Sequence, residues 1–170
     1  MKTDVPRPIR LKDYRAPDYL IDTVKLDFAL APARTRVRSR LELRPNRQAA
    51  KAGAPLSLDG ESFDLGEVRL DGKVLTAGDY EVSETHLVIP RVPRQPFTLE
   101  IETFVNPEAN KALQGLYRSR GIYCTQCEAE GFRRITYFLD RPDVLAVYTT
   151  RIEADAEEAP VLLSNGNPVE

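Results

Sequence analysis

The stretch LIDTVKLDFALAPARTRVRSRLELR, residues 20–44, alternates apolar and polar side chains in two runs that a short break separates. The first run places its apolar side chains on even positions: Leu20, Val24, Leu26, Phe28 and Leu30. In the second run, Val37, Leu41 and Leu43 alternate with charged residues, most of them arginine. Because successive side chains of a strand point to opposite faces, each run predicts a half-buried strand. The segment APAR between them turns the chain, so the stretch predicts a hairpin with one apolar face and one arginine-rich, solvent-exposed face.

The rest of the chain continues this pattern in short runs punctuated by 13 prolines and 9 glycines. Further strand candidates are residues 56–58, 63–70, 74–75, 80–82, 87–89, 97–103, 144–152 and 161–163. The pair Asp71-Gly72 predicts a two-residue hairpin turn, because both residues tolerate positive φ. No segment of 12 residues keeps a helical period, and only residues 107–116 and 128–139 could hold a short helical turn. The pattern predicts an all-β fold, an antiparallel β-sandwich or open barrel with one or two short helical turns.

Length and composition indicate one ordinary globular domain, with 170 residues, 42% apolar content and a net charge of −2. No apolar run approaches the roughly 18 residues that cross a bilayer. The start, MKTDVPRPIR, lacks the apolar core of a signal peptide. Only two cysteines are present, which is too few for a disulfide scaffold. We therefore expect a reducing, cytoplasmic location and no membrane partner.

Six arginines crowd the region of the second strand: Arg34, Arg36, Arg38, Arg40, Arg44 and Arg47. Arginines on alternate positions share one face of a strand, so the cluster could bind nucleic acid. A solvated strand face is the favoured interpretation, because no aromatic residues interleave with the arginines and the chain as a whole is slightly acidic.

The stretch CTQCEAEGF, residues 124–132, admits three interpretations. Structural zinc needs four ligands, but Cys124 and Cys127 supply two and the one histidine, His86, lies far off in sequence. A redox pair needs a helix N-terminus in a βαβ unit, which the surrounding pattern does not offer. In the third interpretation, the polar side chains of the stretch are its functional part. If the segment is extended, Gln126, Glu128 and Glu130 share one side while Cys127 packs inward. Composition leaves open whether that side meets solvent or a ligand.

Residues 125–150, TQCEAEGFRRITYFLDRPDVLAVYTT, closely resemble the segment that ends the N-terminal domain of bacterial aminopeptidase N, a family of gluzincin zinc aminopeptidases. The motifs DYRAPDY at residues 13–19 and LLSNGN at residues 162–167 resemble the same family in the same order. The family has a histidine where this chain has Arg134. The resemblance implies a saddle-shaped antiparallel β domain that lies against a thermolysin-like catalytic domain.

The resemblance also implies site residues. It assigns Glu128 to the free α-amino group of the substrate and Gln126 to the pocket for the first side chain, so both are expected substrate-binding residues. For Glu130 and Asp140 we expect surface or structural roles. A carboxylate suits the first task, because an ammonium group distinguishes a chain end from an internal peptide bond. The expected partners are therefore peptide N-termini.

The catalytic signature of zincins, H-E-x-x-H, needs two histidines, and this chain has one. The family's G-x-M-E-N loop is also absent. We therefore expect residues 1–170 to be a single N-terminal domain of a longer aminopeptidase, with no catalytic residue and no metal ligand of its own. Zinc would belong to the catalytic domain, the second expected partner. The turn predicted at residues 164–167 also lacks a returning strand. The alternative is an autonomous β-sandwich module that binds peptide, sugar or protein.

Overall fold

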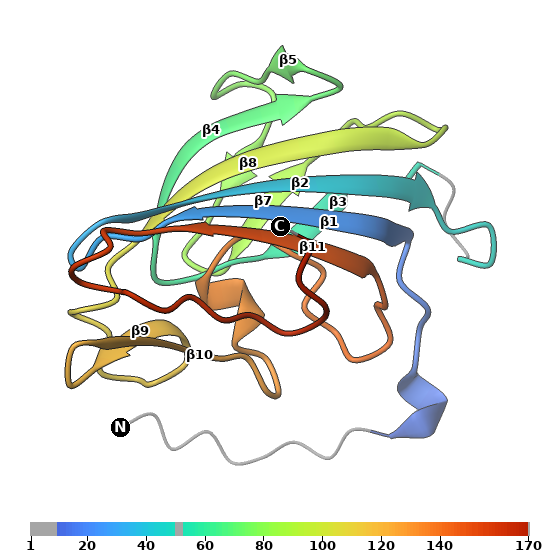
Figure 1. Cartoon of the computed structure of the whole chain (residues 1–170). Coiled ribbons are helices and arrows are strands. Elements are labelled where there is room, and N and C mark those ends of the chain that lie inside the picture. The colour runs from blue at the N-terminus through green and yellow to red at the C-terminus, as the bar shows by residue number, and fades with distance from the viewer. Residues whose placement is uncertain (1–9, 50–52, 170) are drawn as a thin grey trace.

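The computed structural model describes residues 10–49 and 53–169, which form three β-sheets and two single turns of 3-10 helix (Figure 1). The largest sheet has six strands, in the spatial order β11 (Val147–Glu153), β1 (Tyr19–Ala29), β2 (Thr35–Pro45), β8 (Phe97–Val105), β4 (Asp64–Leu70) and β5 (Lys73–Val74). A second sheet has the order β3 (Leu56–Asp59), β7 (His86–Ile89) and β6 (Glu81–Val82). The third pairs β9 (Gly115–Ser119) with β10 (Ile122–Gln126). The helical turns are η1 (Leu11–Asp13) and η2 (Phe132–Arg134).

The predicted hairpin of residues 20–44 is present as strands β1 and β2. Val24 lies opposite Leu41 and Phe28 opposite Val37, and all four side chains are buried. On the other face, the Arg38, Arg40 and Arg44 side chains are exposed, as the alternation predicts. Burying a side chain such as Leu41 contributes about 1.5–3 kcal/mol relative to leaving it exposed. The apolar alternation therefore fixes which face of β2 packs inward.

One position in this hairpin differs from the prediction. The pairing register of β1 shifts between Ile21 and Thr23, so Tyr19 and Ile21 are buried whereas Leu20 is only partly buried. An extra residue at a β-bulge exchanges the two faces of a strand, and the inward positions before the bulge are therefore odd. The expectation that Leu20 belongs to the inward set is wrong for this reason.

The all-β fold class is confirmed, with one parallel pairing in the large sheet. Strand β11 runs parallel to β1, and every other pairing among the described strands is antiparallel. The predicted hairpin turn at Asp71-Gly72 is confirmed as well, since it joins the paired residues Leu70 and Lys73. Both of its residues have positive φ, 49° and 79°, as a two-residue type I′ hairpin turn requires.

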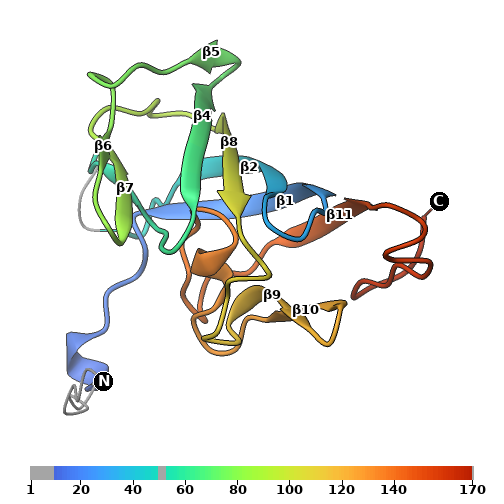
Figure 2. The same cartoon turned by 90° about the vertical axis from the view of Figure 1, so that its left-hand side faces the viewer.

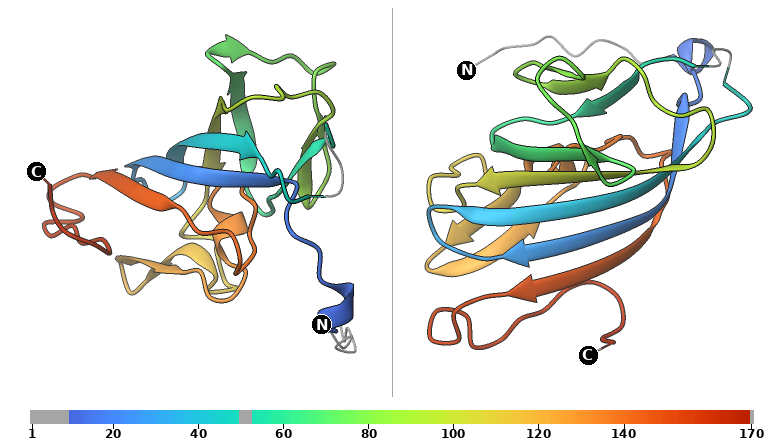
Figure 3. Two further views of the ribbon diagram at one scale, coloured as in Figure 1. Left: turned by 90° about the vertical axis from the view of Figure 1, so that its right-hand side faces the viewer. Right: turned by 90° about the horizontal axis from the view of Figure 1, so that it is seen from above.

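The core lies between the inner face of the six-stranded sheet and a second layer built from β3, β7 and residues 132–139. Strong twist carries β4 and β8 across the direction of β1 and β11 (Figure 2), while β8, β2, β1 and β11 lie side by side (Figure 3). Two buried hydroxyl groups join the layers. The Ser39 hydroxyl lies 3.0 Å from that of Thr136, and the Thr103 hydroxyl donates to the Ile135 carbonyl at 2.8 Å. The segment that follows the CTQCEAEGF stretch is thus fixed to the centre of the sheet.

Three other expectations meet the structure differently. Residues 107–116 form turns and the start of β9 rather than a helical turn, whereas η2 does fall within residues 128–139. Strands β9 and β10 were not predicted, because their turn, Arg120-Gly121, is not a usual hairpin pair. Residues 161–163 are not a strand, and Leu163 is 86% exposed.

Within residues 10–49 and 53–169, no helix is long and apolar enough to cross a membrane.

Candidate functional site

Strand β10 carries the first of the two expected substrate-binding residues. It lies beside β9 (Figure 1), and its last residue, Gln126, is paired with Gly115. The hairpin between the two strands closes through Arg120 and Gly121, with φ of 51° and 87°. Gly115 has φ of 70°, and a Cβ atom there would lie 2.6 Å from Cβ of Arg134. This close approach seats β9, and with it Gln126, against the end of η2.

Glu128 lies in a tight turn of residues 127–131 that directly follows β10. The Gly131 amide donates to the Cys127 carbonyl at 2.9 Å, and the Gln126 side-chain amide donates to the Glu128 carbonyl at 3.3 Å. The expectation that Gln126, Glu128 and Glu130 share one side of an extended segment is therefore wrong, because the chain turns after Gln126. All three residues are nevertheless exposed, so their side chains remain available to a ligand.

Glu128 differs from the neighbouring glutamate in its partners. The Glu130 carboxylate lies 3.5 Å from the Arg133 guanidinium. In the part of the chain that the structure describes, Glu128 forms no ion pair and its carboxylate accepts no hydrogen bond. An exposed carboxylate without a cation is free to meet a positively charged group. The structure thus distinguishes two glutamates that residue type alone would leave equivalent.

The two cysteines do not form a metal site with their surroundings. Cys127 is partly buried and packs against the core, as predicted, and its burial, followed by the charge of Asp140, raises the pKa of its thiol. Cys124 is partly buried on β10, with its thiol 3.8 Å from the Ile122 carbonyl. Among residues 10–49 and 53–169, no group of three or more His, Cys, Asp and Glu side chains could hold a metal ion. The donor set of the described residues therefore does not fit zinc.

An aromatic cluster lies beside the turn of residues 127–131. The Phe132 and Phe138 rings meet edge to face with centroids 4.9 Å apart, and the Tyr148 ring on β11 lies 6.0 Å from Phe132. Burial raises the pKa of the Tyr148 phenol, and the nearby charges of Asp140 and Cys127 raise it further. Tyr148 is still 47% exposed. The cluster is thus an apolar wall that reaches from the core to the surface next to the turn.

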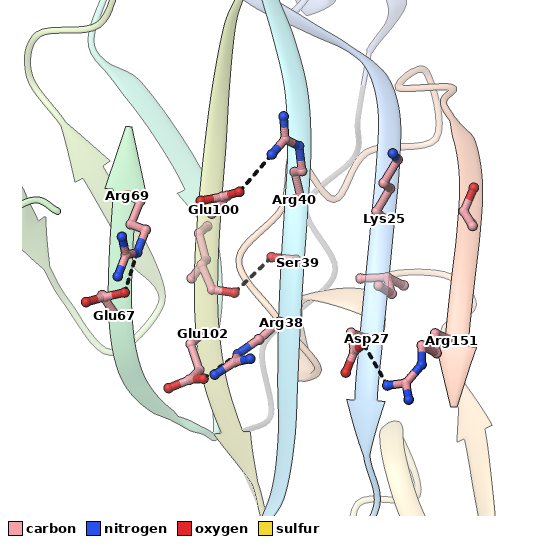
Figure 4. Close-up of a pocket in the computed structure, with 13 residues that line it drawn as sticks. Lys25, Asp27, Arg38, Ser39, Arg40, Glu67, Arg69, Glu100, Glu102 and Arg151 are labelled. Carbon is pink, nitrogen blue, oxygen red and sulfur yellow. Dashed lines mark hydrogen bonds and ion pairs between the residues drawn. The ribbon is translucent and has the colours of Figure 1, made fainter. Parts of the chain in front are cut away.

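A separate hollow of about 670 Å³ lies on the arginine-rich face of the six-stranded sheet (Figure 4). Three ion pairs across neighbouring strands lie in this hollow. Arg38 contacts Glu102 at 2.8 Å, Arg40 contacts Glu100 at 2.9 Å, and Arg151 contacts Asp27 at 3.0 Å. Exposed pairs of this kind contribute at most about 1 kcal/mol each to stability. The pairs do, however, occupy Arg38 and Arg40 of the arginine cluster, and Arg34 and Arg44 also lie against carboxylates, which favours the solvated strand face over a nucleic-acid site.

Sequence reasoning missed two features around Glu128. Gly131 is required because a Cβ atom there would lie 2.5 Å from the Gln126 carbonyl oxygen. Arg134, which stands where a histidine was expected, pairs with Glu61 at 2.9 Å. For Asp140 a surface or structural role was expected, and the structure shows the second, since the residue is 8% exposed and contacts Arg133. The one available signal was Gly131 itself, placed directly after a run of polar residues.

Comparison with known sequences gives a consistent set of relatives. Residues 22–170 match the family described as Peptidase M1 N-terminal domain. Aminopeptidase N of Caulobacter vibrioides is 51% identical over 169 residues, which are 99% of this chain and 19% of that protein. Aminopeptidase N of Escherichia coli is 47% identical over 170 residues, covering 98% and 18%. The chain thus spans about a fifth of the length of these relatives.

Solved structures give the same result. Aminopeptidase A of Legionella pneumophila, in complex with aspartic acid, is 36% identical with a TM-score of 0.88, covering 95% of this chain and 19% of that one. An M1 zinc metallopeptidase of Deinococcus radiodurans is 16% identical with a TM-score of 0.67, covering 84% and 34%. The second similarity concerns the fold alone.

Proposed function

Because the chain belongs to the peptidase M1 N-terminal domain family, as the N-terminal region of an aminopeptidase N, we propose that it recognises the free amino end of peptides for a zinc-dependent aminopeptidase. In this proposal residues 1–170 are one domain of a longer chain, and the catalytic domain of that chain is its partner. The family membership confirms the resemblance that the motifs at residues 13–19, 125–150 and 162–167 indicated. A cytoplasmic location is also proposed, and the two free thiols support it.

The observation that carries the proposal is the exposed carboxylate of Glu128, which forms no ion pair among the described residues. In the proposed complex it binds the α-ammonium group of the substrate. Two unit charges about 4 Å apart attract by about 4 kcal/mol at an effective dielectric constant near 20. Internal peptide bonds carry no such charge, so this contact selects chain ends. It also fixes the distance from the chain end to the peptide bond that is cleaved.

Gln126 has a different role in the proposal. Its side-chain amide donates to the Glu128 carbonyl, so it supports the turn. The remaining amide surface is exposed at the end of β10, where it can line the pocket for the first side chain of the substrate. The Tyr148 side of the aromatic cluster supplies an apolar surface nearby. Gln126 and Glu128 together therefore read the first residue of a peptide, one through its side chain and one through its amine.

Zinc enters the proposal only through the rest of the enzyme. The donors of this chain do not fit the ion, because three-ligand groups are absent among the described residues and the sequence holds a single histidine. When bound in the catalytic domain, zinc supplies the Lewis acid that polarises a peptide carbonyl. The residues described here hold and orient the substrate's amino end.

A comparison of the complete aminopeptidase with the isolated 170-residue chain tests this function. The complete enzyme should release the first residue of a peptide with a free amino end, leave the N-acetylated peptide intact, and lose its activity on chelation of zinc. The isolated chain, purified without a histidine tag, should contain no stoichiometric zinc and cleave neither peptide. Equal cleavage of the free and acetylated peptides by the complete enzyme would refute recognition of the amine. Stoichiometric zinc in the isolated chain would refute the division of roles.

A further inference from the structure

We propose that Asp140 and Arg133 are positioning residues for Glu128, because their contacts fasten the turn of residues 127–131 to strand β3. This inference rests on the proposed role of Glu128 in binding the substrate amine. Neither residue touches the substrate in the proposal. Together they determine where the Glu128 carboxylate lies when the amine arrives.

The contact between Asp140 and Arg133 is dense and mostly shielded from solvent. One oxygen of the Asp140 carboxylate accepts hydrogen bonds from the Arg133 backbone amide at 3.1 Å and from its Nε at 3.0 Å. A terminal nitrogen of the same guanidinium donates to the Asp140 carbonyl at 3.1 Å. The side chains are 10% and 22% exposed, respectively. A charged pair with three hydrogen bonds holds its two residues in one geometry.

The pair is itself anchored to β3 and to the segment that follows it. The Asp140 amide donates to the Asp59 carboxylate at 3.1 Å, and Asp59 exchanges two backbone hydrogen bonds with Phe138, at 2.7 and 3.0 Å. The Glu61 amide donates to the Arg133 carbonyl at 2.9 Å. Residues 133–140 are therefore tied at both ends to residues 59–61. Because these residues belong to the packed second layer, they give the turn a fixed support.

The turn that carries Glu128 spans the short distance between this support and the end of β10. The Arg134 amide donates to the Gly131 carbonyl at 3.1 Å, and the Gly131 amide closes the turn on Cys127. On the other side, Gln126 is held by its pairing with Gly115. Six residues, 127–132, join these two fixed points, and the hydrogen bond that closes the turn leaves them little freedom. A shift of Arg133 would therefore move Glu128 directly.

The charges of the pair also favour this role. Burial lowers the pKa of the Arg133 guanidinium, but the hydrogen bond to Asp140 and the charges of Asp59, Glu130 and Asp140 outweigh it and raise that pKa overall. Asp140 is thus matched by a permanent cation. An amide at position 140 would keep the shape but would lose the charge, and its NH₂ group could face the Arg133 donors.

A double-mutant cycle in the complete aminopeptidase tests the inference. Asp140→Asn should lower kcat/KM by roughly tenfold in the wild-type background. In the Glu128→Ala background the same change should alter kcat/KM by less than about twofold, because the residue that it positions is gone. Arg133→Lys, which keeps the charge, should recover part of the activity that Arg133→Gln loses. Asp143→Asn is the matched control, since Asp143 pairs with Arg141 at a more exposed site, and it should stay within about twofold of wild type.

The outcomes separate the two proposals. Equal losses from Asp140→Asn in both backgrounds would overturn the positioning role and leave the proposed function intact. An unchanged kcat/KM for Glu128→Ala alone would refute the proposed function, and the positioning role with it. If thermal melts show that Asp140→Asn does not fold, the same double-mutant cycle is measured with Arg133→Lys in its place. Equal losses from Arg133→Lys in the wild-type and Glu128→Ala backgrounds would then overturn the positioning role. A failure of Arg133→Lys to exceed Arg133→Gln in activity would also count against the inference.

Discussion

Replacing Glu128 with alanine in the complete aminopeptidase is expected to lower kcat/KM for peptides by roughly two to three orders of magnitude. In the proposed complex the carboxylate faces the substrate ammonium, and the bound peptide partly removes both charges from water. Loss of one partner from a buried pair costs about 3–5 kcal/mol, and a partly buried pair belongs at the lower end of that range. Each 1.36 kcal/mol corresponds to about a factor of ten in rate. Steady-state kinetics with a dipeptide or an aminoacyl amide measures the effect.

Three further variants test whether the expected loss is specific to the Glu128 carboxylate. Glu128→Gln keeps the shape and one acceptor and should lose less than Glu128→Ala. Gln126→Ala should lose less again and should mainly change which first residue is preferred. Glu130→Ala is the control and should be nearly neutral, because its carboxylate is mostly exposed and an exposed ion pair contributes little. Thermal melts check that all variants fold. Near wild-type kcat/KM for Glu128→Ala, or a greater loss for Glu130→Ala, would show that the amine-binding residue is misassigned.

Gly131→Ala is expected to lower both stability and activity, although it removes no polar group from the site. The added Cβ atom would lie 2.5 Å from the Gln126 carbonyl oxygen and 2.9 Å from Cα of Cys127. Both are backbone atoms, so the turn itself must open. Forcing atoms into a packed site costs about 1–3 kcal/mol. Because opening the turn displaces Glu128, kcat/KM should also fall by at least roughly tenfold at temperatures where the protein is folded.

Gly78→Ala provides the matched control for this experiment. A Cβ atom at Gly78 would meet no atom within 4 Å, so the change should alter the free energy of unfolding by no more than about 0.5 kcal/mol. Chemical denaturation measures stability, and kinetics at low temperature measures activity. Wild-type stability and activity for Gly131→Ala would mean that the turn of residues 127–131 tolerates another shape. The geometry of the turn would then not fix the position of the Glu128 carboxylate.

Local alternation predicted the framework of the fold because it depends only on which face of each strand is buried. The hairpin of β1 and β2, the strand of residues 97–103 and the turn at Asp71-Gly72 all follow from patterns within a few residues. Other features depend on contacts between distant segments. The parallel pairing of β11 with β1 joins residues more than a hundred positions apart. The bulge after Ile21 was missed because Tyr19, Leu20 and Ile21 are all apolar, so alternation there does not say which face is inward. Strands β9 and β10 turn through Arg120, which rarely adopts positive φ.

The candidate site was predictable in part. The motif resemblance singles out Gln126 and Glu128, and their substrate-binding role stays a prediction; their residue types alone left solvent and ligand as open alternatives. The ion pair of Glu130 with Arg133 and the burial of Asp140 depend on how residues 127–140 fold back on β3. The sequence around Asp140, which reads Asp-Arg-Pro-Asp, is typical of an exposed turn. Asp140 is buried where Asp59 and Arg133 form hydrogen bonds with it, and these bonds cannot be predicted from the residues next to it in sequence.

The distance between the Glu128 carboxylate and the α-amino nitrogen of a bound amino acid tests the central claim most directly. A crystal structure of the complete, zinc-loaded aminopeptidase with a product amino acid provides this distance. We predict a charge-assisted hydrogen bond of about 2.8 Å between one Glu128 oxygen and the amino nitrogen. An amino nitrogen held by other groups, with the Glu128 carboxylate beyond hydrogen-bond reach, would contradict the claim that this domain recognises the amino end of the peptide.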